Sequence, residues 1–133
     1  MGVGAVLRRS AVKFPEKTAL IFEGRRTTYG ELNRRVNRTA HGLLRLGLRK
    51  GDRAAVLLHN GPEFIELYFA CAKSGVIFVP VNNLLKAREL AQIFTYIKPR
   101  ALVFDQDFAA TIGGILPELP FLEFPVSLQE SPG

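Results

Sequence analysis

This 133-residue sequence lacks most of the features that mark secreted and membrane proteins. Cys71 is the only cysteine, so the chain cannot form an internal disulfide, as expected for a protein of a reducing compartment. No apolar run approaches the roughly 20 residues that a transmembrane helix needs. The first residues do not show the charged segment followed by an apolar one that a secretory signal has. We therefore expect a cytoplasmic protein without a transmembrane segment.

The basic residues lack the aromatic neighbours that a site for single-stranded nucleic acid would need. The formal net charge is +6, and much of it gathers in one stretch: Arg34, Arg35, Arg38, Arg45, Arg49, Lys50 and Arg53. No aromatic side chain interleaves with these residues, and no helix-turn-helix or zinc-finger pattern occurs. We expect no nucleic-acid partner. The basic stretch is either the solvated face of one helix or a surface for an acidic partner.

The patterns of common cofactor, metal and phosphorylation sites are also missing. Residues 2–7, GVGAVL, have neither the third glycine nor the preceding strand of a dinucleotide-binding loop. His41 and His59 have no second ligand at metal spacing, and His41 is predicted to be solvated. Asp105 follows a strand as a phosphoacceptor would, but the acidic pair that such a fold also needs is replaced by His59 and Asn60. We predict no catalytic residue and no metal site in this chain.

The sequence does contain a regular alternation of strand and helix patterns. Helices are predicted at residues 3–13, 28–47, 62–75, 84–99 and 108–116, and strands at residues 18–22, 25–29, 54–58, 76–81, 101–104 and 121–124. The strands at 54–58, 76–81 and 101–104 are continuous apolar runs, as expected for strands buried on both faces. Residues 125–133 are mostly polar, with proline and glycine, and are predicted to be a frayed tail.

Short local signals indicate where several of these elements begin and end. Thr28 and Glu31 have the spacing of a capping box, and Gly47 is suited to end the same helix. Asn60 is predicted to cap the next helix, with Pro62 in its first turn. Buried strands that alternate with helices indicate a parallel sheet with right-handed crossovers. The fold class is therefore predicted to be α/β: a single domain with a mostly parallel buried sheet and flanking helices, preceded by an N-terminal helix and a β-hairpin.

Three motifs occur in the order in which a known family carries them. A helix start of the form Thr-Tyr-x-Glu-Leu lies at residues 28–32, a Gly-Asp pair before a strand at 51–52, and a Lys-x-Gly-x-x-x-x-Pro segment at 73–80. Over about residues 14–105 the chain resembles the start of the adenylate-forming superfamily, which includes acyl-CoA synthetases, luciferases and the adenylation domains of peptide synthetases. The segment PVNNLLKAREL at 80–90 is most similar to the fatty acyl-CoA synthetase branch.

The resemblance implies a parent protein that is an ATP-dependent acid-CoA ligase. Such an enzyme forms an acyl-adenylate and then a CoA thioester, here with a medium or long fatty acid, and it uses ATP, Mg²⁺ and CoA. The family's phosphate-binding Gly/Ser/Thr-rich loop, ribose-binding aspartate and C-terminal lysine are absent from these 133 residues. We therefore expect an N-terminal fragment of the large domain that is inactive alone. Its main partner would be the rest of the ligase chain, and homo-oligomers stay an open alternative.

The resemblance also indicates which residues would meet substrates in the complete enzyme. Lys86 and Arg88 would be available to the phosphates of CoA, although Leu84 stands where some relatives carry an arginine that can meet the CoA nucleotide. Because ligands gather at the carboxyl edge of a parallel sheet, His59 and Asn82 are further candidate contacts.

Each of these candidates has a structural interpretation as well. Lys86 and Arg88 can be exposed residues of the first helical turn without a ligand. Asn82 can accept hydrogen bonds from amides of its turn, and His59 can be an ordinary loop residue. The alternative function for the whole chain is a non-enzymatic α/β module that binds an acidic partner through its basic helix face.

Overall fold

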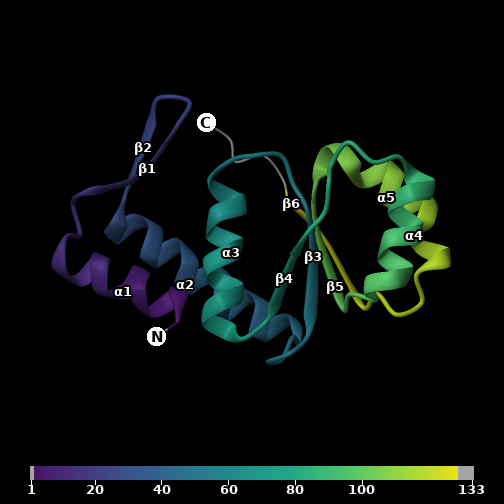
Figure 1. Ribbon diagram of the computed structural model, residues 1–133, viewed down its shortest axis with the longest axis horizontal. Coiled ribbons are helices and arrows are strands. Elements are labelled where there is room, and N and C mark those ends of the chain that lie inside the picture. The colour runs from purple at the N-terminus through teal and green to yellow at the C-terminus, as the bar shows by residue number, and fades with distance from the viewer. Residues whose placement is uncertain (1, 129–133) are drawn as a thin grey trace. The chain divides into compact units, whose positions relative to one another are not determined.

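The computed structural model describes residues 2–128, and the chain divides into two compact units. Unit 1 is formed by Met1–Lys50 and Asn60–Val76, and unit 2 by Gly51–His59 and Ile77–Gly133. Each unit is therefore built from two separate segments of the sequence, which can be followed by colour in Figure 1. The prediction of a single domain stays a prediction.

Unit 1 combines helices with a β-hairpin. The helix α1 (Val3–Lys13) is followed by the antiparallel strands β1 (Thr18–Phe22) and β2 (Arg25–Thr28), and then by the helices α2 (Tyr29–Leu46) and α3 (Pro62–Ser74). All five elements confirm the predictions from periodicity, because each boundary lies within one residue of the expected one.

The hairpin and α2 begin and end where the local signals indicate. Glu23 (φ 50°) and Gly24 (φ 75°) both have positive φ, which suits the right-handed twist of the two strands. At the start of α2, the Thr28 hydroxyl accepts a hydrogen bond from the Glu31 backbone N–H at 3.2 Å. Gly47 ends the helix with φ 120°. The predicted cap and the predicted stop of α2 are both confirmed.

The helices of unit 1 pack through apolar side chains and are also joined by polar contacts. The stripe that α2 buries consists of Leu32, Val36, Ala40 and Leu43, and α3 buries Leu67, Ala70 and Cys71. The Lys73 ammonium donates to the side-chain oxygens of Asn33 (2.8 Å) and Asn37 (2.6 Å), which ties α3 to α2. The helix α1 approaches α3 closely, because a Cβ at Gly4 would lie only 2.5 Å from Cγ of Lys73.

The start of α3 differs from the prediction. Asn60 is predicted to be its cap, but Gly61 occupies that position with an extended backbone (φ 169°, ψ 178°). The physical reason is Pro62, which is the first helical residue and restricts the residue before it to extended conformations. The helix therefore begins directly after Gly61, and Asn60 lies one residue outside it.

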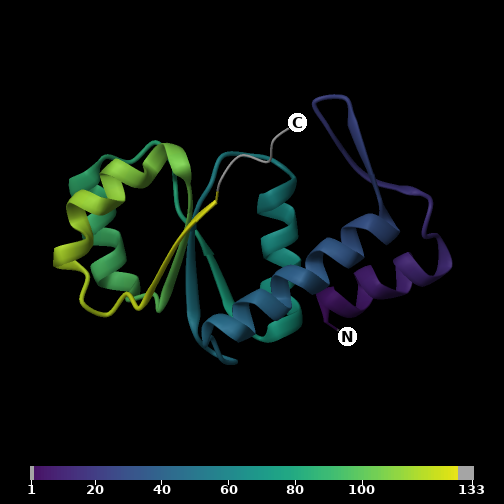
Figure 2. The ribbon, with the colours of Figure 1, turned by 180° about the vertical axis from the view of Figure 1, so that it is seen from behind.

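In the described residues, unit 2 contains a parallel four-stranded sheet and two α-helices. Its strands are β3 (Arg53–Leu57), β4 (Ile77–Pro80), β5 (Ala101–Asp105) and β6 (Phe124–Leu128), in the order β4-β3-β5-β6, and all neighbours are parallel. Figures 1 and 2 show α4 (Ala87–Ile97) and α5 (Ala109–Ile115) on the same face of this sheet. Short 3₁₀ turns, Gln106–Phe108 and Leu116–Glu118, flank α5. The predicted α/β class is confirmed.

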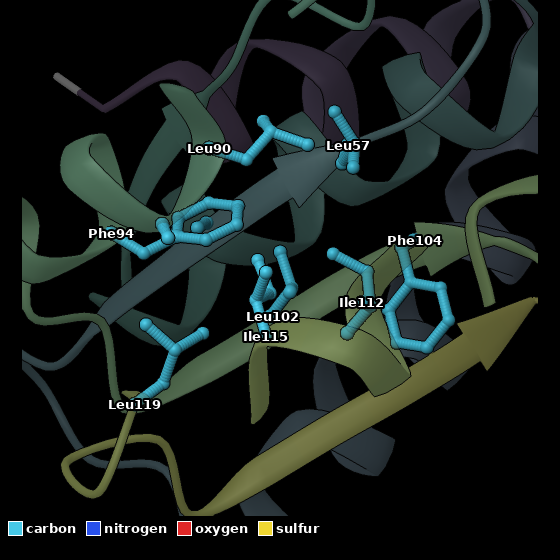
Figure 3. Close-up of a cluster of buried hydrophobic side chains, with 10 residues drawn as sticks. Leu57, Leu90, Phe94, Leu102, Phe104, Ile112, Ile115 and Leu119 are labelled. Carbon is cyan, nitrogen blue, oxygen red and sulfur yellow. The ribbon is translucent and has the colours of Figure 1, made fainter. Parts of the chain in front are cut away.

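The core of unit 2 lies between the sheet and these two helices (Figure 3). Alternate residues of β3 and β5, among them Leu57, Leu102 and Phe104, meet Leu90 and Phe94 of α4 there. Burying one such side chain stabilises a fold by roughly 1.5–3 kcal/mol. The intervening residues of β3 and β5 are buried too, as predicted for continuous apolar runs.

The strand β4 is less covered than predicted. Residues 76–81 are predicted to be buried on both faces, but β4 lies at the edge of the sheet, where Ile77 is 47% exposed and Pro80 is exposed. The apolar run showed that residues 76–81 form a strand. It could not show that this strand lies at the edge of the sheet, because that depends on how the other strands pair.

The strand β6 begins later than predicted. Residues 121–123 lie outside the strand. The buried Leu119 anchors this segment in the core, and its carbonyl accepts a hydrogen bond from the N–H of Leu122 at 3.1 Å. The strand begins only at Phe124 and runs to Leu128. The frayed tail predicted for residues 125–133 is therefore wrong as far as Leu128, and the remainder lies outside the described residues.

Each outer strand carries a proline whose backbone nitrogen faces away from the sheet. In β4, the N–H groups of Ile77 and Val81 donate toward β3 at 2.8 and 2.9 Å, so Pro80, at the alternate position, faces outward. In β6, the N–H of Phe124 donates toward the start of β5 at 3.1 Å, so Pro125 faces outward. Neither proline therefore costs the sheet a hydrogen bond.

Candidate functional site

The residues that follow β3, β4 and β5 meet at the carboxyl edge of the sheet in unit 2. Parallel strands all end at the same edge, and open α/β sheets commonly bind their ligands there. His59 follows β3, Asn82 and Asn83 follow β4, and Asp105 is the last residue of β5. The candidate site is this group of residues together with the first turn of α4.

His59 is held by two carboxylates and an aromatic ring. Its backbone N–H donates to Oδ2 of Asp105 at 2.6 Å, and its ring Nε2 lies 3.2 Å from Oδ2 of Asp107. The imidazole also stacks at a tilt on Phe108, with ring centroids 5.1 Å apart. This arrangement fixes the ring beside the Asp107 carboxylate. The side chains of His59 and Asp107 are 55% and 71% exposed, so water reaches the pair.

Asp105 follows a strand, as a phosphoacceptor would, but its carboxylate already accepts a hydrogen bond. Its carboxylate accepts the His59 amide at the end of the neighbouring strand, which closes the loop after β3 against β5. This role is structural.

The asparagines after β4 shape the turn into α4. The Asn82 side-chain oxygen accepts from the N–H of Leu84 at 2.9 Å, which confirms the structural interpretation of this residue. Asn83 acts differently, because its side-chain amide donates to the carbonyl of Leu58 at 3.1 Å. Asn82 thus shapes the turn itself, and Asn83 brings the turn next to the segment that carries His59.

The two predicted CoA contacts lie on α4 in different environments. Lys86 precedes the helix with an exposed side chain, and its backbone N–H donates to Oε1 of Glu89 at 3.1 Å. Arg88 forms a two-pronged ion pair with Glu118, at 2.7 and 2.8 Å. These hydrogen bonds raise the pKa of Arg88 and lower the pKa of Glu118. The Arg88 guanidinium is therefore engaged in joining α4 to the turn after α5, whereas the Lys86 ammonium faces solvent.

Sequence reasoning missed three members of this edge: Asp107, Phe108 and Glu118. The first two lie in the run DQDF directly after a strand, and this clustering of carboxylates and an aromatic ring at a strand end was a usable signal. Glu118 gave no such signal, because it lies 30 residues from its partner in the sequence. The proposed roles of His59, Asn82, Lys86 and Arg88 toward a substrate stay predictions.

The part of the chain that the structure describes has no group of three or more histidine, cysteine, aspartate or glutamate side chains that could hold a metal ion. Among residues 2–128, none of the helices is both long and apolar enough to cross a membrane.

Sequence comparison identifies relatives along nearly the whole chain. The profile of a family described as "AMP-binding enzyme" matches residues 7–126. A feruloyl-CoA synthase of Amycolatopsis sp is 38% identical over 114 residues, which cover 86% of this chain and 23% of that protein. A crotonobetaine/carnitine-CoA ligase of Salmonella paratyphi B is 44% identical over 100 residues, which cover 71% of this chain and 19% of that protein. The chain thus spans about a fifth of the length of these relatives.

Structural comparison gives the same result. A crystal structure of a candidate long-chain-fatty-acid CoA ligase from Rhodopseudomonas palustris superposes with a TM-score of 0.91 at 36% identity. The superposition covers 100% of this chain and 34% of that one.

Proposed function

The chain belongs to the family of AMP-binding enzymes, and on this premise we propose that it is the N-terminal part of the large domain of an ATP-dependent acid-CoA ligase. The observation that carries the proposal is the family match over residues 7–126, with CoA-ligase relatives at 38% and 44% identity. The alternative of a non-enzymatic module for an acidic partner is not favoured, because these relatives are named as synthases and ligases.

The reaction of the parent enzyme has two steps in this proposal. The carboxylate of the acid attacks the α-phosphorus of ATP and displaces pyrophosphate, and Mg²⁺ would supply positive charge that offsets the charge of the phosphates. The CoA thiol, after losing its proton, then attacks the acyl carbonyl and displaces AMP. Unit 2 supplies a rigid sheet with polar residues at its carboxyl edge, and the phosphate-binding loop must come from the rest of the parent chain. We therefore propose that the 133-residue chain alone makes no acyl-adenylate.

We propose a medium or long fatty acid as the substrate. The support is the likeness, at 36% identity, to the candidate long-chain-fatty-acid CoA ligase together with the sequence of the turn after β4. The relatives named for feruloyl and crotonobetaine/carnitine substrates define the competing acid classes.

Acid-dependent exchange of pyrophosphate into ATP tests both proposals. The full-length parent enzyme should exchange fastest with fatty acids of medium or long chain, and slowly with an aromatic acid or a carnitine. The isolated chain should give no exchange with any acid. Exchange that is fastest with an aromatic acid would reject the fatty-acid assignment only, whereas a parent enzyme that activates no carboxylic acid would reject the ligase function.

We propose that Lys86, and with less freedom Arg88, contacts the phosphates of CoA in the parent enzyme. Lys86→Ala should raise the KM for CoA several-fold and leave pyrophosphate exchange unchanged, because adenylate formation precedes CoA binding. Glu118→Gln is the matched control for Arg88, because it releases the guanidinium from its ion pair. If Arg88 contacts CoA, Arg88→Ala raises this KM and Glu118→Gln does not. If both variants alter only the thermal midpoint, Arg88 is structural.

We propose that the partner of this chain is the rest of the parent ligase. We also propose that units 1 and 2 belong to one domain and that the parent enzyme is cytoplasmic. Analytical ultracentrifugation of the parent enzyme would decide between a monomer and a homo-oligomer.

A further inference from the structure

The peptide group between Leu58 and His59 is held by a side chain on each side. These two residues directly follow β3, and the peptide group that joins them is one rigid plane with the Leu58 carbonyl and the His59 N–H on opposite sides. The side-chain amide of Asn83 donates to the carbonyl at 3.1 Å, and Oδ2 of Asp105 accepts from the N–H at 2.6 Å. We name this peptide group, together with Asn83 and Asp105, the peptide clamp.

The peptide clamp continues the hydrogen-bonding pattern of the sheet beyond the end of β3. That strand lies between β4 and β5, and Asn83 follows β4 whereas Asp105 ends β5. The register of β3 with β5 ends at the pair Leu57 and Phe104. Beyond this pair the donor and the acceptor come from side chains, so both backbone groups still have partners. The clamp therefore extends the restraint of the sheet by one peptide group.

The peptide clamp also restrains the His59 side chain. A peptide plane that is held on both sides cannot turn freely, which restricts the backbone at the Cα that carries the imidazole. The ring lies with Nε2 3.2 Å from Oδ2 of Asp107 and with its centroid 5.1 Å from that of the Phe108 ring. The His59 side chain is nevertheless 55% exposed. Burial does not explain this restraint, and a restrained, exposed imidazole is suited to contact a ligand.

The peptide clamp joins His59 to the turn for which CoA contacts are proposed. Asn83 lies in the turn between β4 and α4, shortly before Lys86. The hydrogen bond from its side chain to the Leu58 carbonyl ties this turn to the segment after β3. CoA carries phosphates and a nucleotide base, and an imidazole can hydrogen-bond to the former and stack on the latter.

We propose that Asn83 and Asp105 are positioning residues for CoA binding in the parent enzyme. They hold the peptide group before His59, and the imidazole contacts the bound CoA beside the turn that carries Lys86. Both positioning residues act through His59 and do not contact CoA themselves. This inference rests on the proposed function, because it takes CoA as the ligand of this edge.

Hydrogen exchange of the His59 amide, followed by NMR on the 133-residue chain, tests the clamp itself. Asp105→Ala removes the acceptor and should speed this exchange about tenfold, because a hydrogen bond to a charged group is lost. Asp105→Asn keeps an oxygen acceptor of the same shape and should speed it less than about threefold. Gln106→Ala, at the next and exposed position, is the matched control and should leave the rate unchanged. Equal rates in Asp105→Ala and the unchanged chain would overturn the proposal.

Steady-state kinetics of the parent enzyme test the role in CoA binding. His59→Ala should raise the KM for CoA about tenfold, and Asn83→Ala and Asp105→Ala should each raise it about fivefold, as expected for the loss of one polar contact. Asp105→Asn should restore most of the affinity. Pyrophosphate exchange should stay unchanged in all four variants, because adenylate formation precedes CoA binding. A KM that is unchanged in Asn83→Ala and Asp105→Ala would overturn the proposal.

A double variant distinguishes positioning from direct contact. If Asn83 acts through His59, His59→Ala/Asn83→Ala should raise the KM for CoA no further than His59→Ala alone. Effects that multiply would overturn the proposal, because Asn83 would then act independently of the imidazole. Asn83→Ala also carries the test from the other side of the peptide group where Asp105→Ala fails to fold.

The same kinetics separate this inference from the proposed function. An unchanged KM for CoA in His59→Ala, with normal pyrophosphate exchange, would overturn the inference and leave the ligase function intact. A parent enzyme that shows no pyrophosphate exchange with any acid would reject the ligase function, and the inference with it.

Discussion

Unit 1 carries thirteen lysine and arginine residues against five aspartate and glutamate residues, whereas unit 2 carries five against seven. Unit 1 therefore has a formal charge of +8 and unit 2 of −2, which together give the net +6 of the chain. The overall charge conceals this difference. A charge argument made for the whole chain, such as a general affinity for acidic partners, applies to unit 1 alone.

The two units also hold their helices in different ways. Unit 2 packs α4 and α5 on a sheet through a continuous apolar core. Unit 1 adds polar contacts between helices: Lys73 of α3 bonds to Asn33 and Asn37 of α2, and Arg35 of α2 pairs with Glu66 of α3 at 3.4 Å. Part of the basic stretch that the sequence presents as a solvated face thus has a structural partner. We expect stability to depend on volume in unit 2 and, in unit 1, also on the hydrogen bonds of Lys73 to α2.

The largest effect is expected from Phe94→Ala in the core of unit 2. Phe94 is fully buried, and its loss should lower the free energy of unfolding by about 3–5 kcal/mol, because both transfer energy and a cavity are involved. Tyr96→Ala in the same helix is the control, since Tyr96 is 90% exposed. It should change stability by less than about 0.5 kcal/mol. Urea unfolding followed by circular dichroism measures both, and a loss below about 1 kcal/mol for Phe94→Ala would contradict a volume-dominated unit 2.

A smaller effect is expected from Lys73→Met in unit 1. The substitution keeps most of the apolar stem and removes the two hydrogen bonds to α2, so it should cost about 1–2 kcal/mol. Burial, followed by the nearby Arg8, lowers the pKa of Lys73, and this opposes the charged form and limits the gain from pairing. Arg34→Gln, at an exposed position of α2, is the control and should be near neutral. Equal or greater stability of Lys73→Met would show that α2 and α3 need only apolar packing.

The smallest effect is expected from Glu66→Gln, and it should depend on pH. Burial raises the pKa of Glu66 above its ordinary value even though Arg35 opposes this shift. A raised folded-state pKa means that the stability contribution is fully present below the unfolded pKa, near 4.5, and is lost as pH rises through the folded pKa. Glutamine resembles the protonated form, so Glu66→Gln should be more stable at pH 7 by less than about 1 kcal/mol.

The pH dependence makes this prediction specific. The advantage of Glu66→Gln should disappear below about pH 4, where the native carboxyl group is protonated in both states. Glu16→Gln, at an exposed position, is the matched control for the loss of one carboxylate. Thermal unfolding of the three proteins from pH 3 to pH 7 provides the comparison. A variant that is less stable at pH 7 would mean that the ion pair with Arg35 outweighs the cost of burial.

Much of the fold could be predicted because its signals are local. Thr28 capping α2 and the continuous apolar run of β5 depend on neighbouring residues, and both predictions are confirmed. The order of motifs was enough to identify the family, which the match over residues 7–126 confirms. The start of β6 and the exposure of β4 could not be predicted in this way, because they depend on how strands from distant parts of the chain pair.

The candidate site was harder to predict than the fold for a related reason. His59 and Asn82 were identified from their positions after strands. The run DQDF places Asp107 near a strand end, but its pairing with His59 depends on how the segments after β3 and β5 come together. Arg88 was expected to be available to the phosphates of CoA. Its ion pair with Glu118 depends on where α5 ends. The local sequence can show which side chains reach an edge, whereas their pairing is decided by the assembled unit.

The outward prolines of β4 and β6 have a consequence for the behaviour of this protein at high concentration. An open sheet edge invites a strand from another molecule, and repeated pairing of this kind produces insoluble aggregates. Pro80 and Pro125 each remove one of the few outward N–H groups that such pairing would use. Between them they interrupt both open margins of the sheet. A solution of the 133-residue chain should therefore resist β-aggregation during expression and concentration, even though the strands of this sheet are rich in valine, leucine and phenylalanine.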